Sequence, residues 1–224
     1  MDAYAAVVLA GGAARRMGGV DKPARTVGGL PMRERVLAAV ADAAPRILVG
    51  PPGPVPAGVR VTREEPPGAG PVAAAAAGLA LLDPGTPVVA LLAADLPLLT
   101  RAAVGELLGH LDAGQDGVCY VDDDGRRQTL CGVWRVAPLR AALDRVATER
   151  ASGHPDEPTE RPDGPAERAS GHPEGSAAPL TGAPIRALLA GLRVREVPWS
   201  GAGPPPWFDC DTDEDVRRAE EWTR

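Results

Sequence analysis

The glycine-rich, basic segment LAGGAARRMGGVDK at residues 9–22 has the residue types needed to bind the phosphates of a nucleotide. Gly11 and Gly12 have no side chain to keep backbone N–H groups away from phosphate oxygens. The adjacent arginines and Lys22 would add positive charge beside a triphosphate. The segment matches neither GxxxxGK[ST] nor GxGxxG, so those two binding modes are not expected. An ordinary glycine-rich turn with surface charges is the alternative interpretation.

The composition draws attention to Lys22. It is the single lysine of the chain, in which the other 23 of the 24 basic residues are arginine. Because arginine is used at nearly every basic position, the one position that has lysine indicates a need for a compact ammonium rather than a planar guanidinium. We therefore expect Lys22 to contact phosphate, although a lone lysine can also arise by chance.

A second candidate is Asp95, the last residue of the apolar run PVVALLAAD. In an open parallel sheet, ligands bind beyond the carboxyl ends of the strands, where a carboxylate can hold Mg²⁺. The alternative is a turn or helix-capping role, which Asp often has before Pro.

A third candidate is the segment FDCDT near the end of the chain. Asp209 and Asp211 alternate, so in an extended segment both side chains would point to the same side and could supply a second carboxylate to a metal. Alternatively, Asp211 or Thr212 caps the last helix.

Hydrophobic patterning predicts the strands and helices that carry these residues. Residues 4–10 and 87–95 are apolar on both faces, as in buried parallel strands, and helical patterns alternate with strands along the chain. Further strands are expected at 46–50, 59–62, 117–121, 129–135 and 194–199, and helices at 32–44, 71–82, 100–111, 136–147, 184–192 and 211–222. This order predicts a single α/β domain over residues 1–224. Its mostly parallel, doubly wound, Rossmann-like sheet would be the middle layer of an α/β/α sandwich.

Residues 149–181 do not fit this pattern. The sequence ERASGHP occurs twice, at 149–155 and 167–173, in a tract of Pro, Gly, Ser and charged residues. Such a tract cannot bury enough apolar surface to offset its ordering entropy. We predict a disordered, low-complexity insertion.

Charge and hydropathy exclude several functions. A net charge of −6 argues against a general nucleic-acid binder. The longest apolar runs are shorter than the roughly 20 residues that cross a bilayer, and the N-terminus lacks the basic start of a signal peptide. We expect a soluble, cytoplasmic protein with neither nucleic-acid nor membrane partners. Cys119, Cys131 and Cys210 form no metal or redox motif and are expected to be buried thiols.

At these residues the sequence resembles the MobA-like nucleotidyltransferases, most closely the molybdenum cofactor guanylyltransferases. Residues 9–22 agree with the family signature LAGGxxxRMGGxDK at every specified position. The resemblance continues through Gly29 and Pro31, Gly70 and Pro71, the strand that ends at Asp95, and FDCDT.

The resemblance implies the fold of the nucleotide-diphospho-sugar transferases and Mg²⁺-dependent transfer of GMP from GTP to the terminal phosphate of molybdenum-molybdopterin, with release of pyrophosphate. It places Lys22 and Arg16 at the reacting phosphates and Asp95, with Asp211, at the metal. The nucleotide-binding residues would be Leu9, Ala10, Gly11, Gly12, Lys22 and Asp95. Partners would be GTP and molybdopterin, and further proteins of cofactor biosynthesis or apo-molybdoenzymes are possible partners.

Some positions depart from the guanylyltransferase pattern. Gly50, Pro51 and Pro52 follow the second strand, where asparagine is common. The family element GPxxG reads GPVAA at residues 70–74, and FDCDT replaces the usual FxNxNT. The acidic form resembles related cytidylyltransferases. A cytidylyltransferase acting on molybdopterin or another phosphorylated acceptor is therefore an alternative, and so is a non-catalytic adaptor that binds nucleotide or molybdopterin.

Overall fold

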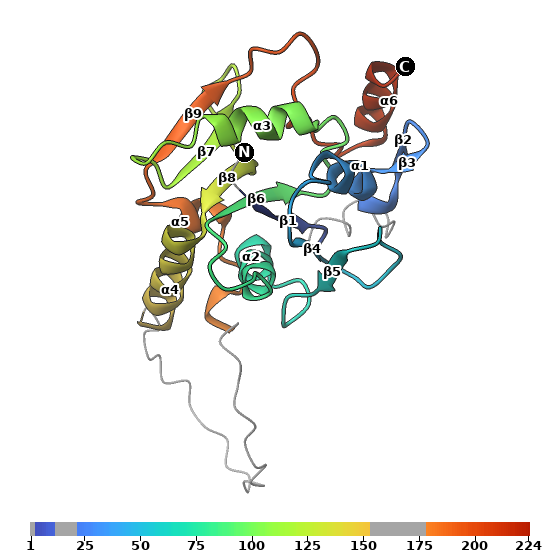
Figure 1. Ribbon diagram of the computed structural model, residues 1–224. Coiled ribbons are helices and arrows are strands. Elements are labelled where there is room, and N and C mark those ends of the chain that lie inside the picture. Colours follow the sequence, from blue (N-terminus) through green and yellow to red (C-terminus); the bar gives the residue numbers. More distant parts are fainter. Residues whose placement is uncertain (1–2, 12–21, 153–177) are drawn as a thin grey trace, which may run out of the picture.

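Seven strands form one central sheet in the computed structural model, which describes residues 3–11, 22–152 and 178–224 (Figure 1). The strands are β1 (Ala5–Leu9), β4 (Arg46–Val49), β5 (Val59–Thr62), β6 (Val88–Ala93), β7 (Gly117–Val121), β8 (Arg127–Arg135) and β9 (Val194–Pro198). Their order is β5-β4-β1-β6-β8-β7-β9, and all pairs are parallel except those of β8 with β6 and with β7. The prediction of a mostly parallel sheet is confirmed.

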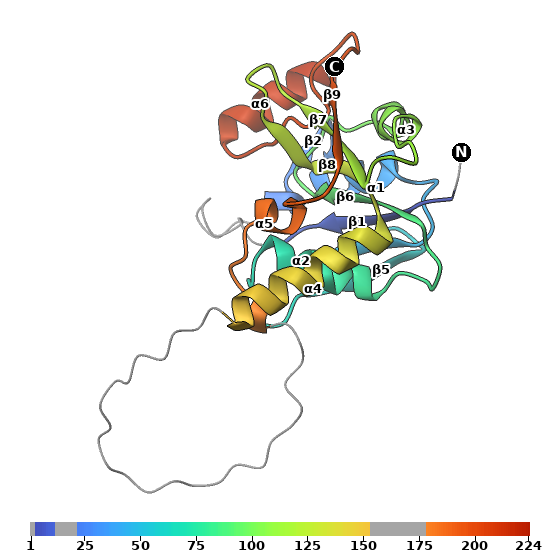
Figure 2. The same cartoon turned by 90° about the vertical axis from the view of Figure 1, so that its left-hand side faces the viewer.

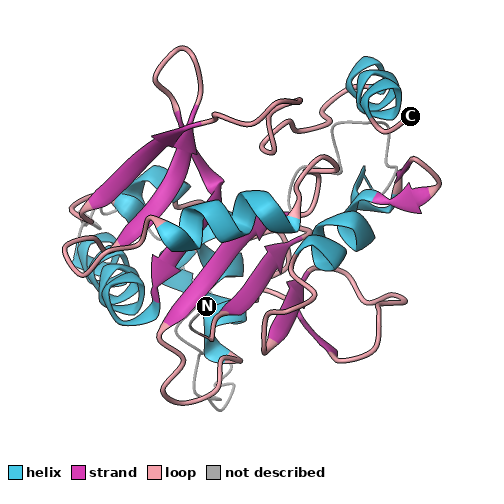
Figure 3. Ribbon diagram, turned by 45° about the horizontal axis from the view of Figure 1, so that its top comes forward, coloured by secondary structure: helices cyan, strands magenta, loops and turns pink. Residues whose placement is uncertain are grey.

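Helices cover both faces of this sheet (Figures 1 and 2). On one face lie α1 (Met32–Ala39) and α3 (Arg101–Gly109). Figure 3 shows the same arrangement. The other face carries α2 (Pro71–Ala80), α4 (Val136–Ser152) and α5 (Ile185–Leu189). The predicted three-layer arrangement is therefore confirmed. None of the helices in the described ranges is long and apolar enough to span a bilayer.

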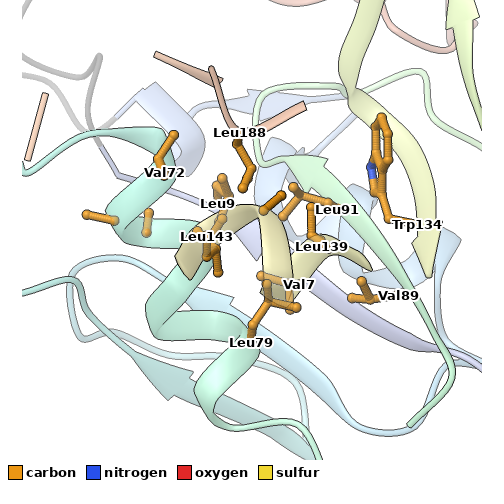
Figure 4. Packing of buried hydrophobic residues seen from close by; sticks show 14 of the residues in the cluster. Val7, Leu9, Val72, Leu79, Val89, Leu91, Trp134, Leu139, Leu143 and Leu188 are labelled. Atoms are coloured by element: carbon orange, nitrogen blue, oxygen red, sulfur yellow. The ribbon is translucent and has the colours of Figure 1, made fainter. Parts of the chain in front are cut away.

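The interior strand β1 is buried on both faces, because its side chains alternate between two apolar cores. Val7 and Leu9 point to the α2 and α4 side, where they pack with Leu79 and Leu143 (Figure 4). Ala6 and Val8 contribute to the core under α1 and α3. The end of β1 is thus held from both sides.

Strand β8 extends beyond the neighbouring β6. The last pair of the two strands joins Leu92 to Cys131, whereas residues 127–130 of β8 continue past that point. Because β8 runs antiparallel to β6, this extension lies at the carboxyl edge of the parallel strands, where it is still paired with β7. It forms a wall beside the residues that follow β6.

A small hairpin that the sequence interpretation did not include lies beside the last helix. Strands β2 (Thr26–Val27) and β3 (Leu30–Pro31) are joined by Gly28 and Gly29, with φ values of 58° and 80°. Positive φ at both central residues is the geometry of a tight hairpin turn that glycine adopts readily. Helix α6 (Asp213–Trp222) packs on β2, and a third apolar cluster comprises Val27, Met32, Leu98, Cys210, Val216 and Ala219.

The limits predicted for the insertion, 149–181, are wrong at both ends. Helix α4 continues to Ser152, and residues 178–180 form the short 3₁₀ helix η3 (Ala178–Leu180). Arg150 connects the two flanks, because its Nε and Nη2 donate to the carbonyls of Pro179 and Thr181, both at 2.8 Å. These bonds, and the burial of Leu180, give the flanks the partners that a purely polar tract lacks. The intervening residues 153–177 lie outside the described residues.

Candidate functional site

A cleft of about 540 Å³ opens at the carboxyl edge of the parallel strands. Its walls come from the ends of β1 and β6, the segment before α2, the extension of β8, and residues 207–211. It thus occupies the edge at which ligands bind in open α/β sheets. Leu9, Gly11, Asp95 and Asp211, four of the residues predicted as a site, line this one cleft.

Backbone hydrogen bonds fix the residues at the end of β1. The N–H of Ala10 donates to Val49 at 2.7 Å, and the carbonyl of Leu9 accepts from Ala94 at 2.9 Å. The Ala10 side chain is buried, and a Cβ added to Gly50 would lie 2.9 Å from the Ala10 Cβ. Gly50 therefore allows a close approach of two loops, and no side chain fits at this position without a shift.

The structure describes only part of the remaining phosphate-binding segment. Gly12 and Arg16 lie outside the described residues. The backbone of Lys22 begins the 3₁₀ helix η2 (Lys22–Ala24), which leads into β2. The contacts proposed for these three residues stay predictions.

Glu64, which the sequence interpretation missed, lies beside the phosphate-binding segment. It is the single buried charged side chain in the part of the chain that the structure describes, at 4% exposure. Its Oε1 accepts from the Gly68 N–H at 2.9 Å and would lie 3.2 Å from a Cβ at Gly11. Its Oε2 has no hydrogen-bond partner among the described residues. A buried oxygen left without a donor costs free energy.

A signal for Glu64 was present in the sequence. The residue follows β5 by two positions, just as Asp95 follows β6 by two. An acidic residue just beyond a predicted strand is a candidate for the ligand site, and by this criterion the strand at 59–62 indicates Glu64 as the strand at 87–95 indicates Asp95.

The three acidic candidates, Asp95, Asp209 and Asp211, all line the cleft. The Cys210 N–H donates to the Asp95 carbonyl at 3.2 Å, which fastens the segment 207–211 beside the end of β6. Asp209 and Asp211 both line the cleft, whereas Cys210 between them is fully buried in the third apolar cluster. The predicted alternation of side chains is confirmed.

The alternative role of Asp211 as the helix cap is not observed. Thr212 is the N-cap of α6: its Oγ1 accepts from the Asp215 N–H at 3.2 Å, and Asp215 Oδ2 accepts from the Thr212 N–H at 2.7 Å. The following helix α3 is likewise capped by Thr100 and not by Asp95. Neither Asp95 nor Asp211 is needed as a helix cap.

These carboxyl groups fit a Mg²⁺ ion only together with a substrate. Among the described residues, no three His, Cys, Asp or Glu side chains are grouped closely enough to hold a metal by themselves. Mg²⁺ is commonly held by one or two carboxylates, waters and substrate phosphates, and Asp95 and Asp211 can supply the carboxylates.

The β8 side of the cleft is formed by Arg127, Gln128, Thr129, Leu130 and Cys131, with Trp207 also lining the cleft. Arg127 Nε donates to Glu196 Oε1 at 2.6 Å. The cysteine thiols do not offer a nucleophile here: all three are buried, as predicted, and burial raises the pKa of Cys119 to about 11 and that of Cys131 further. Among the described residues, the chemistry of the cleft therefore rests on its carboxyl groups, Arg127 and backbone amides.

Comparison with known proteins identifies one family. Residues 6–155 match the family model of the MobA-like NTP transferase domain. The molybdenum cofactor guanylyltransferase of Nitrobacter hamburgensis is 36% identical over 148 residues, which are 62% of this chain and 70% of that protein. The protein of the same name from Bradyrhizobium is 34% identical over 61% of this chain and 70% of its own length.

Solved structures share the fold. A molybdopterin-guanine dinucleotide biosynthesis protein A from Archaeoglobus fulgidus superposes with a TM-score of 0.63 at 18% identity, covering 96% of each chain. A 2-C-methyl-D-erythritol 4-phosphate cytidylyltransferase from Thermus thermophilus gives 0.61 at 20% identity, covering 98% of each.

The fold is the one that nucleotidyltransferases share, and the cleft lies at its carboxyl edge. More narrowly, the chain belongs to the MobA-like NTP transferase family, since the family model covers more than half of it and its relatives exceed 30% identity. The resemblance inferred from residues 9–22 is thereby confirmed.

Proposed function

We propose that this protein transfers GMP from GTP to the terminal phosphate of molybdenum-molybdopterin and releases pyrophosphate. The relatives named molybdenum cofactor guanylyltransferase support the reaction class and the acceptor. The choice of GTP rests on one observation: Oε2 of buried Glu64, beside Gly11, has no hydrogen-bond partner among the described residues.

Glu64 suits guanine better than cytosine. The Watson–Crick edge of guanine carries two adjacent donors, N1–H and the 2-amino group, to which a carboxyl oxygen can accept hydrogen bonds. The same edge of cytosine carries two acceptors, N3 and O2, and only the 4-amino donor. Facing Glu64, the acceptors would leave a buried oxygen unpaired, which is how a polar site rejects the wrong ligand.

In the proposed reaction a phosphate oxygen of the acceptor attacks the α-phosphorus of GTP in line, and the bond to the β-phosphate oxygen breaks. Lys22 and the backbone amides near Gly11 bind the triphosphate and stabilise the charge that develops on it. Asp95 and Asp211 would hold Mg²⁺, which when bound supplies positive charge to the triphosphate. No covalent enzyme intermediate is required.

The test compares nucleotides in the presence of Mg²⁺ and molybdenum-loaded molybdopterin, with pyrophosphate release as the readout. We expect kcat/KM for GTP to exceed that for CTP by about a hundredfold or more. Glu64→Gln should lower kcat/KM for GTP about tenfold or more, since an acceptor is partly replaced by a donor. It should also reduce the discrimination against ITP, which lacks the 2-amino group.

Glu65→Gln is the matched control, because Glu65 is the exposed neighbour with the same charge. Its kinetics should equal those of the unmodified protein. Equal use of CTP and GTP, or a GTP preference that survives Glu64→Gln, would contradict the assignment of GTP to Glu64.

A cytidylyltransferase is the second candidate, favoured by the acidic pair Asp209 and Asp211 in the cleft. In that case CTP, not GTP, would release pyrophosphate in the same assay. An adaptor without turnover would bind nucleotide and release none.

A further inference from the structure

The charged side chains around the cleft are unevenly distributed. Of those that line it in the described ranges, Asp95, Asp209 and Asp211 are acidic and Arg127 is the one cation. An acceptor that brings its own phosphate to this acidic cleft needs a positive partner. Arg127 is the described side chain that can provide it.

Arg127 lies on the side of the cleft away from the nucleotide-binding segment. In the sheet, β6 separates β1 from β8, so Asp95 at the end of β6 stands between the end of β1 and the start of β8. Gly11 and Glu64 follow β1 and β5, on the opposite side of β6. An anion bound by Arg127 would therefore meet the nucleotide phosphates near Asp95 from the other direction.

Glu196 fixes how Arg127 presents its charge. Arg127 pairs with Val121 on β7, and Glu196 lies on β9 at the far edge of β7, opposite Cys119. The bond from Nε to Glu196 Oε1 holds one edge of the planar guanidinium. No other hydrogen bond of Arg127 is found among the described residues, so both Nη groups remain for a ligand. Two parallel N–H groups are the geometry that binds a phosphate in bidentate fashion.

The ion pair has little structural value of its own. The side chains of Arg127 and Glu196 are 45% and 43% exposed, and pairs exposed to this degree contribute little to folding stability. The Arg127–Glu196 ion pair therefore serves to position a cation at the cleft rather than to hold β9 to β8.

We propose that Arg127 binds the phosphate monoester of the acceptor, and that Glu196 is a positioning residue that orients the Arg127 guanidinium toward it. The inference deepens the proposed function, on which it rests for the identity of the acceptor. It assigns the nucleotide and the acceptor phosphate to opposite sides of Asp95.

The test is equilibrium binding, by calorimetry, of molybdopterin and of molybdopterin from which a phosphatase has removed the terminal phosphate. The unmodified protein should bind the phosphorylated form about tenfold or more tightly, as expected for one charge-assisted bidentate contact. Arg127→Ala should bring the ratio of the two dissociation constants close to one. Glu196→Gln should reduce the ratio about threefold, and Arg127→Lys should restore only part of it.

Arg126→Ala is the matched control. Arg126 precedes Arg127, is 78% exposed, pairs with Asp124 and does not line the cleft, so its loss changes the net charge equally. This variant should keep the full preference for the phosphorylated form. GTP affinity should be unchanged in both arginine variants, which also checks that each is folded.

The proposal is overturned if Arg127→Ala keeps the preference for the phosphorylated form, or if the unmodified protein has no such preference. Its failure is distinct from failure of the proposed function. If pyrophosphate release from GTP is normal but the preference does not depend on Arg127, only the acceptor assignment falls. If no nucleotide is turned over but the preference depends on Arg127, the guanylyltransferase assignment falls and the phosphate site stands.

Discussion

The two sides of the cleft are built differently. The nucleotide side, defined by Leu9, Gly11 and Gly68, consists of backbone, glycines and an apolar side chain, with the buried carboxyl group of Glu64 against Gly11. The β8 side, defined by residues 127–131 and Trp207, presents polar side chains from a strand that extends beyond its neighbour. The nucleotide side is continuous with the packed interior, whereas Arg127 on the β8 side is half exposed.

This difference separates two kinds of recognition. A nucleotide bound against backbone amides and a buried oxygen is recognised by groups that cannot move without disturbing β1 and its neighbours. An acceptor bound by a half-exposed arginine is recognised by side chains that can be exchanged at little cost to the fold. Substitutions on the nucleotide side should therefore affect GTP and sometimes stability, and those on the β8 side should affect the acceptor alone.

The largest effect is expected from Lys22→Ala. Turnover should fall about a hundredfold or more, because a preorganised charge at the triphosphate is lost. Lys22→Arg should also be impaired, since a planar guanidinium does not replace a compact ammonium. Pyrophosphate release at saturating GTP measures the effect, and Arg126→Ala serves as the control for loss of one cation on the β8 side. Near-normal turnover of Lys22→Ala would remove the catalytic role of Lys22 and weaken the contrast between the two sides.

Asp95→Asn tests the junction of the two sides. Activity at moderate Mg²⁺ should fall about tenfold to a hundredfold, because a neutral amide is a poorer Mg²⁺ ligand than a carboxylate. A titration of pyrophosphate release against Mg²⁺ should shift to higher concentration. Asp124→Asn, on an exposed turn, should leave the titration unchanged. An unshifted curve for Asp95→Asn would reassign Asp95 to the turn that follows β6.

The sequence predicted those parts of the site that depend on local pattern. Leu9, Gly11 and Asp95 each follow a run of buried apolar residues, and the alternation of Asp209 and Asp211 is visible within five residues. The alternation of strands and helices was likewise enough to predict the mostly parallel sheet and the three layers. Patterns of this kind act over a few residues, so they can be recognised without knowing which strands pair.

Features that depend on distant pairing were missed. Arg127 and Glu196 are 69 residues apart and meet only because β7 lies between β8 and β9. The extension of β8 past β6 follows from the register of an antiparallel pair, which hydrophobic periodicity does not fix. The helical end of α4 was missed because its stability comes in part from Arg150, whose partners lie on the far flank of the insertion.

The smallest effects are expected from substitutions at two helical glycines. Gly78 in α2 faces β1 and β4: an added Cβ would lie 2.4 Å from Val7 Cγ1 and 3.0 Å from Val49 Cγ2. Gly109, the last residue of α3 on the other face of the sheet, has no neighbouring atom within 4 Å of an added Cβ. Both positions avoid the left-handed region, so the two differ mainly in the space around them.

Gly78→Ala should therefore lower the free energy of unfolding by about 1–3 kcal/mol, the usual cost of overpacking a filled core. Gly109→Ala should raise it by up to about 1 kcal/mol, because alanine favours the helix over glycine. Urea denaturation of both variants measures the two values. Since Val7 lies two residues before Leu9, Gly78→Ala should also raise KM for GTP while leaving acceptor affinity unchanged. A Gly78→Ala protein of unaltered stability and KM would mean that α2 shifts freely away from β1, and the nucleotide side would then be no more rigid than the β8 side.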